Sequence, residues 1–250
     1  MNIDAFFLSH FLAWLISCSY VFYKLEFDRN NLHFIHMDLH MKNLVRSFVV
    51  AGIAIILASP AVYAAANAKP LYSSAAAKLK SNDTQGAIAD YTKAIERDPM
   101  DTYAYIRRGI IKGTIGDTLG AMTDFTKAIE IDPKNPQGYS NRGIQKEQNG
   151  AIKSAQEDYT KAIELNPKYA IAYINRGNAK TKAWNFKGAI EDYTKALELN
   201  PKSTLAINNR ATAKGLHGDK EGAIEDYKKS AKLNDPDAKA WLKARALSLK

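Results

Sequence analysis

Small and aromatic residues recur along the chain from residue 68 onward at spacings of four and three positions. Ala121, Phe125 and Ala128 form one such set, and equivalent sets return 34 and 68 residues later. These spacings bring the three side chains onto one face of an α-helix. A second series, which contains Tyr139 and Gly143 in one unit, precedes the repeated set. The pattern therefore predicts two amphipathic helices in every 34-residue unit.

Proline and glycine mark the ends of these helices. Asp-Pro or Asn-Pro dipeptides end four units, at Pro99, Pro133, Pro167 and Pro201. Proline stops a helix because it lacks an N–H and clashes with the preceding turn. Turn residues such as Gly116-Asp117 separate the two halves. Five helix hairpins are predicted, at 68–101, 102–135, 136–169, 170–203 and 204–237. A capping helix is expected within 238–250, where Trp241 takes the aromatic position. One hairpin cannot bury its apolar face alone, so neighbours must stack.

Over residues 68–237 the pattern resembles the tetratricopeptide repeat family. Its aromatic position 4 holds Tyr105, Tyr139 and Tyr173, its small position 8 holds Gly109, Gly143 and Gly177, and its position 24 holds Tyr91, Phe125, Tyr159, Tyr193 and Tyr227. The resemblance implies an all-α, right-handed superhelical solenoid whose first helices line a concave surface where members usually bind peptides. The end units depart from the pattern. Pro70 falls inside the first helix of unit 1, so that helix is expected to start late or fray.

Two charged columns follow the same period. Position 7 holds Arg108, Arg142, Arg176 and Arg210, and position 23 holds Asp90, Asp124, Asp158, Asp192 and Asp226. Because the arginines and aspartates recur with the same period, we expect an Arg–Asp pair that bridges the two helices of each hairpin. The alternative is that these arginines bind a ligand. A third column holds Lys78, Lys112, Lys146, Lys180 and Lys214. Their stems are expected to cover apolar surface while the ammonium groups reach water.

The resemblance implies that positions 2, 5, 6, 9, 12 and 13 face the groove. Position 6 holds Arg107, Asn141, Asn175 and Asn209, and further amides lie at Asn178 and Asn208. Apolar groove positions include Ile106, Ile110, Ile144, Ile171 and Ile174. Side-chain amides donate and accept, so this column resembles the asparagine ladder of some members and predicts binding of an extended peptide. The alternative is that these asparagines are simply tolerated exposed polar residues. The lysines of a carboxylate clamp are missing, because positions 5 and 2 hold residues such as Ile106 and Gln137.

Two apolar runs precede the repeats. Residues 5–23 hold no charged side chain, and residues 48–59 follow the basic residues Lys42 and Arg46 and end at Pro60. A basic start, an apolar core, a helix breaker and small residues are the parts of a secretory signal peptide. Residues 41–68 are interpreted in this way, with cleavage after Ala64 or Ala68. Residues 1–40 are then an over-extended start or an apolar extension with a possible transmembrane segment.

Both interpretations place the repeats outside the cytoplasm, as a periplasmic or secreted protein if cleaved and as a membrane-anchored one otherwise. Membrane contact is expected only through residues 1–68. A cytoplasmic adaptor of the same repeat family is the remaining alternative. Residues 15–18 resemble a lipobox that ends at Cys18, although no basic residue precedes it. His33, His36 and His40 have spacings that could place ligands on one helix face, but no metal site is predicted there.

Composition narrows the function. The net charge of +9 lies entirely in residues 69–250, which hold 31 basic and 22 acidic residues. Because acids are interleaved with the bases, a nucleic-acid-binding stripe is not favoured, and a binder of anionic surfaces or nucleic acid remains an alternative. One cysteine excludes a disulfide framework, and His217 is the only histidine after residue 40. We therefore expect no enzyme activity, cofactor, metal or small-molecule substrate, and instead a scaffold for a protein or peptide partner.

Overall fold

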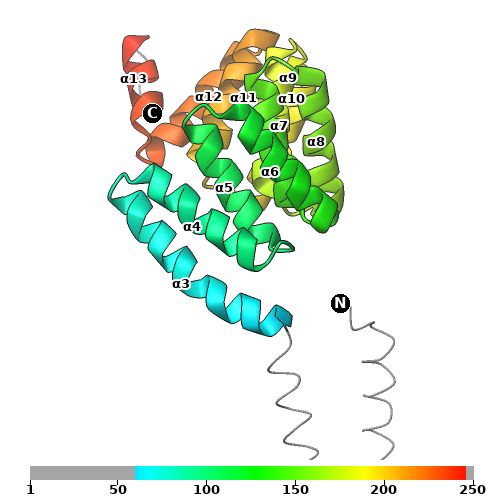
Figure 1. The fold of residues 1–250 in the computed structure, drawn as a ribbon. Helices are drawn as coiled ribbons and strands as arrows, with labels where there is room; N and C mark the ends of the chain where they lie inside the picture. The colour runs from blue at the N-terminus through cyan, green and yellow to red at the C-terminus, as the bar shows by residue number, and fades with distance from the viewer. Residues whose placement is uncertain (1–59, 246–250) are drawn as a thin grey trace, which may run out of the picture. The chain divides into compact units, whose positions relative to one another are not determined.

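The computed structural model describes residues 60–245, and their side chains from residue 68 onward. This part of the chain folds into eleven helices (Figure 1). Their bounds are α3 Pro60–Lys80, α4 Thr84–Arg97, α5 Thr102–Thr114, α6 Thr118–Ile131, α7 Pro136–Gln148, α8 Ile152–Leu165, α9 Ala170–Lys182, α10 Phe186–Leu199, α11 Thr204–His217, α12 Lys220–Lys232 and α13 Pro236–Ala244. Consecutive helices pack against each other along the whole series, so the predicted all-α solenoid of helix hairpins is confirmed.

The first helix departs from its predicted bounds. Helix α3 begins at Pro60, eight residues before the expected boundary at 68, and it includes Pro70. The expectation that this helix starts late or frays is therefore wrong. The capping helix α13 has Pro236 at its first position and begins two residues earlier than expected. Proline is tolerated there because the first N–H groups of a helix have no intrahelical partner.

Side-chain caps define where most second helices begin. Asp83, Asp117 and Asp219 each accept a hydrogen bond from the N–H of a glycine three residues later, at 2.8–2.9 Å. Asn185 makes the equivalent bond in the fourth unit, whereas Ala151 has no side chain to do so. Each such bond satisfies one of the free N–H groups at a helix start.

A glycine and an aromatic ring bring the two helices of a hairpin together. A Cβ atom added to Gly143 would lie 2.7 Å from Cε1 of Tyr159, and the same distance separates a Gly177 Cβ from Tyr193. Tyr159 and Tyr193 are fully buried, with no more than 1% exposure. Only glycine allows the ring of the second helix to lie flat against the backbone of the first. The same contact joins Gly109 and Phe125 in unit 2, so it recurs in the three middle units.

The packing at the C-terminal end of the array differs from that of the middle units. In unit 5 the small residue is Ala211, and Tyr227 stacks on Trp241 of α13 with ring centroids 4.1 Å apart. The guanidinium of Arg245 covers Trp241 at 4.0 Å. The cation and the ring thus cover the last apolar surface of the stack. The prediction that Trp241 belongs to a capping helix is confirmed.

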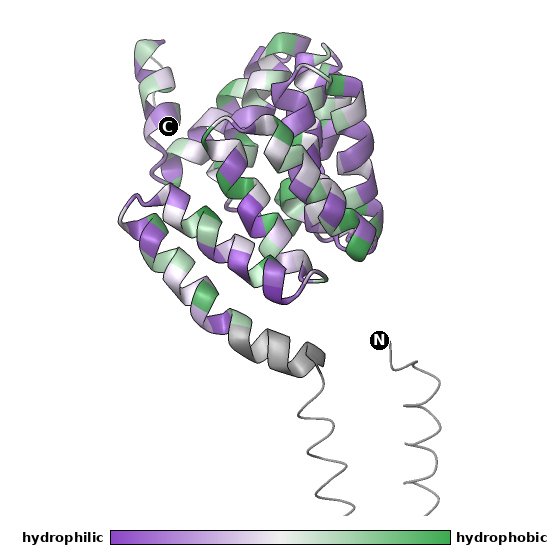
Figure 2. Cartoon of the chain, viewed as in Figure 1, coloured by the Kyte–Doolittle hydropathy of each residue, from purple (hydrophilic) through white to green (hydrophobic). Residues whose placement is uncertain are grey.

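Hydrophobic and hydrophilic residues alternate along the helices of the array, as Figure 2 shows. Within residues 60–245, none of the helices combines the length and the apolar character that crossing a bilayer requires. Several predictions concern residues outside the described part: the extension at 1–40, the apolar run at 5–23, Cys18, the three histidines, and the basic and apolar parts of the signal-like segment.

Candidate functional site

The first helices of successive hairpins lie closer together than the second helices. Helix α5 contacts α7, α7 contacts α9, and α9 contacts α11, whereas contacts between successive second helices are sparser among the described residues. This spacing places the first helices on the inside of the curve. We call their surface the inner face; it carries Arg107, Ile110, Asn141, Ile144, Ile171, Asn175, Asn178, Leu205 and Asn209.

The asparagines of the inner face do not form a uniform ladder. Asn209 donates through Nδ2 to Oδ1 of Asn178 at 2.8 Å, and the Tyr193 hydroxyl donates to the same oxygen at 2.7 Å. Asn141 donates to the main-chain oxygen of Gln137 at 2.9 Å. The amide nitrogen of Asn175 is buried and has no hydrogen-bond partner. The side-chain amides of Asn178 in unit 4 and Asn209 in unit 5 therefore bond to each other, while the amide nitrogen of Asn175, also in unit 4, stays unpaired.

Asn208 does not face the groove as an available amide. Its Nδ2 donates to Oδ1 of Asp235, at 2.9 Å, and so ties α11 to the start of α13. Asp235 also caps α13 by accepting from the N–H of Ala238. Burial would raise the pKa of Asp235, but these hydrogen bonds outweigh it and hold the pKa below its usual value. Asn208 thus secures the capping helix.

The predicted apolar positions divide into two groups. Ile106 and Ile174 are buried, with 3% and 4% exposure, so the prediction that they line an open groove is wrong. Position 5 points toward the adjoining repeat, where close packing removes it from solvent. Ile110 and Ile144 are half-buried, and Ile171 is 48% exposed. Leu205, at the position equivalent to Ile171, is 54% exposed.

A tyrosine cluster surrounds Arg107, and the sequence analysis did not identify it. The ring of Tyr72 lies 6.0 Å from that of Tyr91 and 5.0 Å from that of Tyr103. The Tyr72 hydroxyl donates to Asp101, and burial is the main cause that raises the pKa of this hydroxyl. Tyr103 is 51% exposed, so part of the cluster faces solvent. One signal in the sequence could have indicated this cluster: Tyr103 occupies position 2 of its unit, as Ile171 and Leu205 do in units 4 and 5.

The guanidinium of Arg107 has no carboxylate partner among the described residues. Its Nε is buried and unpaired, and its central carbon lies 6.0 Å from the Tyr103 ring. A hydrogen bond to Tyr91 raises the pKa of Arg107 against the opposing effect of burial. The group therefore stays charged, and its buried Nε is a donor that no acceptor among the described residues satisfies.

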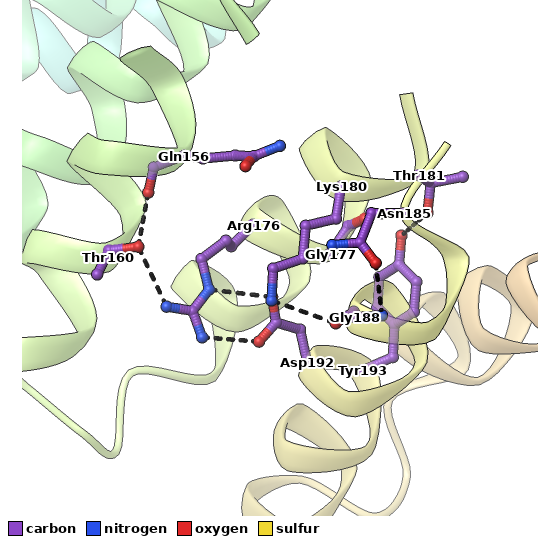
Figure 3. Close-up of polar contacts among 10 residues, drawn as sticks. All are labelled: Gln156, Thr160, Arg176, Gly177, Lys180, Thr181, Asn185, Gly188, Asp192 and Tyr193. Atoms are coloured by element: carbon purple, nitrogen blue, oxygen red, sulfur yellow. Dashed lines mark hydrogen bonds and ion pairs between the residues drawn. The ribbon is translucent and has the colours of Figure 1, made fainter. Parts of the chain in front are cut away.

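The Arg–Asp column forms the predicted bridges. In unit 4, Arg176 donates through Nε and Nη2 to the two carboxylate oxygens of Asp192 at 3.0 and 2.7 Å (Figure 3). Its third nitrogen, Nη1, donates to Thr160 of the preceding unit at 3.1 Å. Equivalent Arg–Asp pairs occur in units 2, 3 and 5. These arginines are therefore engaged within the fold.

The lysine column was predicted incorrectly. The ammonium group of Lys180 lies 2.8 Å from Oδ2 of Asp192, and it also donates to the main-chain oxygen of Gly188 (Figure 3). The equivalent lysines of the other four units contact the equivalent aspartates at 2.8–2.9 Å. Each ammonium group thus ends on a buried carboxylate instead of in bulk water. The Lys180 ammonium group is attracted because the carboxylate of Asp192 is negatively charged and, at 4% exposure, is hardly hydrated by water.

Glu147 connects units 3 and 4 at the edge of the inner face. It accepts from the Tyr159 hydroxyl at 2.8 Å, and Lys182 lies 2.8 Å from its other oxygen. Burial, followed by the hydrogen bond to Glu147, raises the pKa of the Tyr159 hydroxyl well above its usual range. Glu147 is the only acidic residue in helices α5, α7, α9 and α11. It is occupied by these two partners.

Within residues 68–245 no cluster of histidine, cysteine, aspartate and glutamate could hold a metal ion. The inner face instead offers unpaired amide and guanidinium donors beside exposed aliphatic and tyrosine side chains. Such a combination suits recognition of a polypeptide, with main-chain oxygens as acceptors and apolar side chains as contacts.

Tetratricopeptide repeat models match residues 72–136, 137–169 and 170–203, which together span more than half of the chain. The chain therefore belongs to the tetratricopeptide repeat family. The alternation of paired helices and the position of glycines and tyrosines agree with this assignment. The family consists typically of non-catalytic scaffolds that bind protein or peptide partners.

Three solved structures illustrate the shared fold. Residues 41 to the end of MamA from Desulfovibrio magneticus RS-1 are 20% identical, with a TM-score of 0.59, covering 67% of this chain and 94% of that one. PilW, a type IV pilus biogenesis factor, is 22% identical with a TM-score of 0.62 (66% and 77% covered). YrrB, a tetratricopeptide repeat protein with an unusual peptide-binding site, is 23% identical with a TM-score of 0.55 (71% and 91%). No curated protein matches the chain in sequence.

Proposed function

We propose that this protein is a non-catalytic scaffold that binds an extended segment of a protein partner along the inner face. The observation that carries the proposal is a pair of buried donors without acceptors, Nε of Arg107 and Nδ2 of Asn175. They occupy the same unit position two units apart. A buried donor without a partner costs about 1–3 kcal/mol, so an acceptor supplied by a ligand would be favourable. Main-chain oxygens of an extended segment recur along its length and could reach both.

The residues between these two donors support the same mode of binding. Asn141 lies midway, and its Nδ2 is already used within α7, so its Oδ1 is the atom available to accept from a peptide N–H. Ile171 and Leu205, both about half exposed, supply apolar contacts toward the C-terminal end. Main-chain hydrogen bonds would provide affinity, and the apolar contacts would select the partner's side chains.

Peptides selected by phage display on the full chain provide the test. Affinities of the selected peptides are measured for wild type, Arg107→Ala, Asn175→Ala and the control Thr123→Ala, which alters an exposed residue of α6. Loss of one hydrogen bond predicts about 3- to 10-fold weaker binding for the first two variants, with the control unchanged. Thermal unfolding of each variant checks that the fold is intact. Equal affinities for all four proteins would contradict binding at the inner face.

We also propose that the repeats are exported, on the basis of the signal-like segment at 41–68. Both candidate sites lie within α3, and cleavage after Ala68 would in addition remove the side chain of Ala68, which is 2% exposed. This favours cleavage after Ala64. N-terminal sequencing of the protein isolated from its own cells should begin at Ala65. A protein that retains Met1 or Met41 and fractionates with the cytoplasm would instead support the cytoplasmic adaptor.

A further inference from the structure

We propose that the array pivots at the junction between units 2 and 3, so that units 1–2 and units 3–5 move as two rigid segments. The junction is the surface where α7 packs against α5 and α6. The inference goes beyond peptide binding, and its decisive measurement needs no ligand. It arises from interactions that join the other units and are absent at this junction among residues 68–245.

A hydrogen bond that joins successive units elsewhere does not form at this junction. At three other junctions, Nη1 of the position-7 arginine donates to a threonine of the preceding second helix at 3.0–3.2 Å. These bonds run from Arg108 to Thr92, from Arg176 to Thr160 and from Arg210 to Thr194. Arg142 and Thr126 occupy the equivalent positions, yet the side-chain hydrogen bonds of Arg142 both go to Asp158. Because both residue types are present, the bond is missing for a geometric reason: units 2 and 3 are placed differently from the others.

Other polar contacts between units also lie on either side of this junction. Lys182 pairs with Glu147 across units 3 and 4, and Asn209 donates to Asn178 across units 4 and 5. Among the described side chains, no hydrogen bond or ion pair joins a helix of unit 2 to a helix of unit 3. Polar interactions therefore hold the units together within each segment but not across the junction.

A buried amide lies at the junction in place of an apolar side chain. Gln145 of α7 is 5% exposed, and its Oε1 has no hydrogen-bond partner. A Cβ atom added to Gly113 would lie 2.6 Å from Nε2 of Gln145, so the amide lies directly against the backbone of α5. The same unit position holds the buried apolar residues Ile111, Ala179 and Ala213. Separation of α5 from α7 would bring the amide into water, so the unpaired oxygen favours that movement.

The apolar core is interrupted at the same place. One apolar cluster, around Tyr91, is formed by units 1 and 2, and another, around Tyr159, is formed by units 3 and 4. Neither cluster includes a residue from the other side of the junction. Ser140 of α7, at 1% exposure, occupies the buried position that Ile106 and Ile174 fill in units 2 and 4. Because stacked repeats are held together by their interfaces, an interface with less apolar burial opens at a lower cost in free energy.

The N-terminal end of α7 supplies the pivot. A Cβ atom added to Gly138 would lie 2.9 Å from Cγ1 of Ile129, so the backbone of α7 lies directly on α6 at this end. Gln145 lies about two helical turns further along α7. Rotation about the end that is held against α6 therefore changes the gap between α5 and the C-terminal half of α7 most.

The pivot bears on the inner face, because that face crosses the junction. Arg107 belongs to the first segment, whereas Asn141 and Asn175 belong to the second. A peptide that bonds to Arg107 and Asn175 together would hold the two segments in one relative orientation and so favour that state. This consequence rests on the proposed function, whereas the pivot itself does not.

Double electron–electron resonance on the full chain provides the test, with pairs of spin-labelled cysteines in a Cys18→Ser background. Lys127→Cys with Lys195→Cys places labels on units 2 and 4, across the junction. The matched control, Lys161→Cys with Lys229→Cys, places labels on units 3 and 5, within one segment. All four lysines occupy the same unit position and are exposed, and each pair spans two units. The two pairs therefore differ in whether the junction lies between the labels.

Without a ligand, the distance distribution of the pair at 127 and 195 should be broad or show two populations, and that of the control pair should be narrow. Gln145→Met keeps the length of the side chain and removes the unpaired oxygen, so it should reduce the minor population about fivefold or more. The exposed Gln148→Met in the same helix should leave it unchanged. Equal widths for the two label pairs, or a broad distribution that Gln145→Met does not narrow, would overturn the proposal.

A selected peptide whose affinity falls in Arg107→Ala should narrow the distribution of the pair at 127 and 195 and leave the control pair unchanged. A peptide that binds the inner face without this narrowing would refute the coupling. If no peptide binds there, the proposed function fails, and the distances measured without a ligand still decide whether the junction pivots.

Discussion

Replacing Asp192 by Asn should destabilise the array far more than removing an exposed charge of the same helix. Asp192 accepts from Arg176 through two nitrogens and pairs with Lys180, and its side chain is 5% exposed. Asparagine keeps the shape but leaves two partly buried cations without a counter-ion. Removing one member of a buried ion pair costs about 3–5 kcal/mol. Because Arg176 and Lys180 keep 19% and 20% exposure, we expect about 3 kcal/mol.

Thermal and urea unfolding followed by far-ultraviolet circular dichroism provide the measurement. At roughly 2–4 °C per kcal/mol for a chain of this size, Tm should fall by about 6–12 °C. The matched control is Glu198→Gln in the same helix, whose carboxylate pairs with Lys195 but is 57% exposed. Exposed pairs contribute about 0.2–1 kcal/mol, so Tm should fall by no more than about 4 °C.

A double variant separates the penalty of an unpaired charge from the contribution of the pair. Replacing Arg176 by Met and Asp192 by Leu removes this pair together and fills its space with apolar groups, and it leaves Lys180 as one cation without its carboxylate in place of two. The expected stability lies closer to wild type than that of Asp192→Asn, because buried pairs are often replaced by apolar residues at little cost. The reasoning is refuted if Asp192→Asn costs no more than Glu198→Gln, or if the double variant is the least stable of the three.

Three further predictions concern the core and its ionisable groups. Gly177→Ala should lower stability by about 1–3 kcal/mol in urea unfolding, because the added Cβ would lie 2.7 Å from the ring of Tyr193; wild-type stability would contradict the close approach. Burial raises the pKa of Tyr193 to about 12, so its contribution is complete below pH 10 and is lost as the pH rises toward 12. Tyr193→Phe should therefore reduce the loss of stability between about pH 10 and about pH 12, and an unchanged loss would count against this origin. Burial would raise the pKa of Asp90, but the hydrogen bond from Lys78 outweighs it and the pKa is lowered from 3.8. Its contribution is present above that value and is lost as the pH falls through the lowered pKa, so Asp90→Asn should flatten acid unfolding in this range; a parallel acid profile would argue against the Lys78 pairing.

The period of small and aromatic residues was sufficient to predict the hairpins. Ala155 and Tyr159 recur in phase because each unit makes the same contact within its own hairpin, which depends only on local helix geometry. The Arg–Asp bridge was predictable for the same reason, since Arg142 and Asp158 lie 16 residues apart in one hairpin. Signals of this kind need no knowledge of how hairpins stack.

The errors concern positions whose environment depends on a neighbouring unit, or on a second charged residue that shares the same partner. Ile106 and Ile174 were expected in the groove, but stacking of adjacent hairpins buries them. Lys180 was expected in water, but it reaches the carboxylate that Arg176 already holds. The tyrosine cluster at Arg107 combines α3, α4 and α5, which no single repeat predicts.

The sequence by itself determined the number of hairpins and the small–aromatic and Arg–Asp contacts inside them, because a 34-residue period encodes helix faces directly, whereas it misplaced the start of α3 by eight residues. The tertiary structure decided which polar groups remain available. Asn175 and Asn209 occupy the same unit position in units 4 and 5, yet Asn209 bonds to Asn178 while Asn175 keeps a buried donor. Hydrogen-bond pairing depends on distances between units, and those distances arise only when the helices pack.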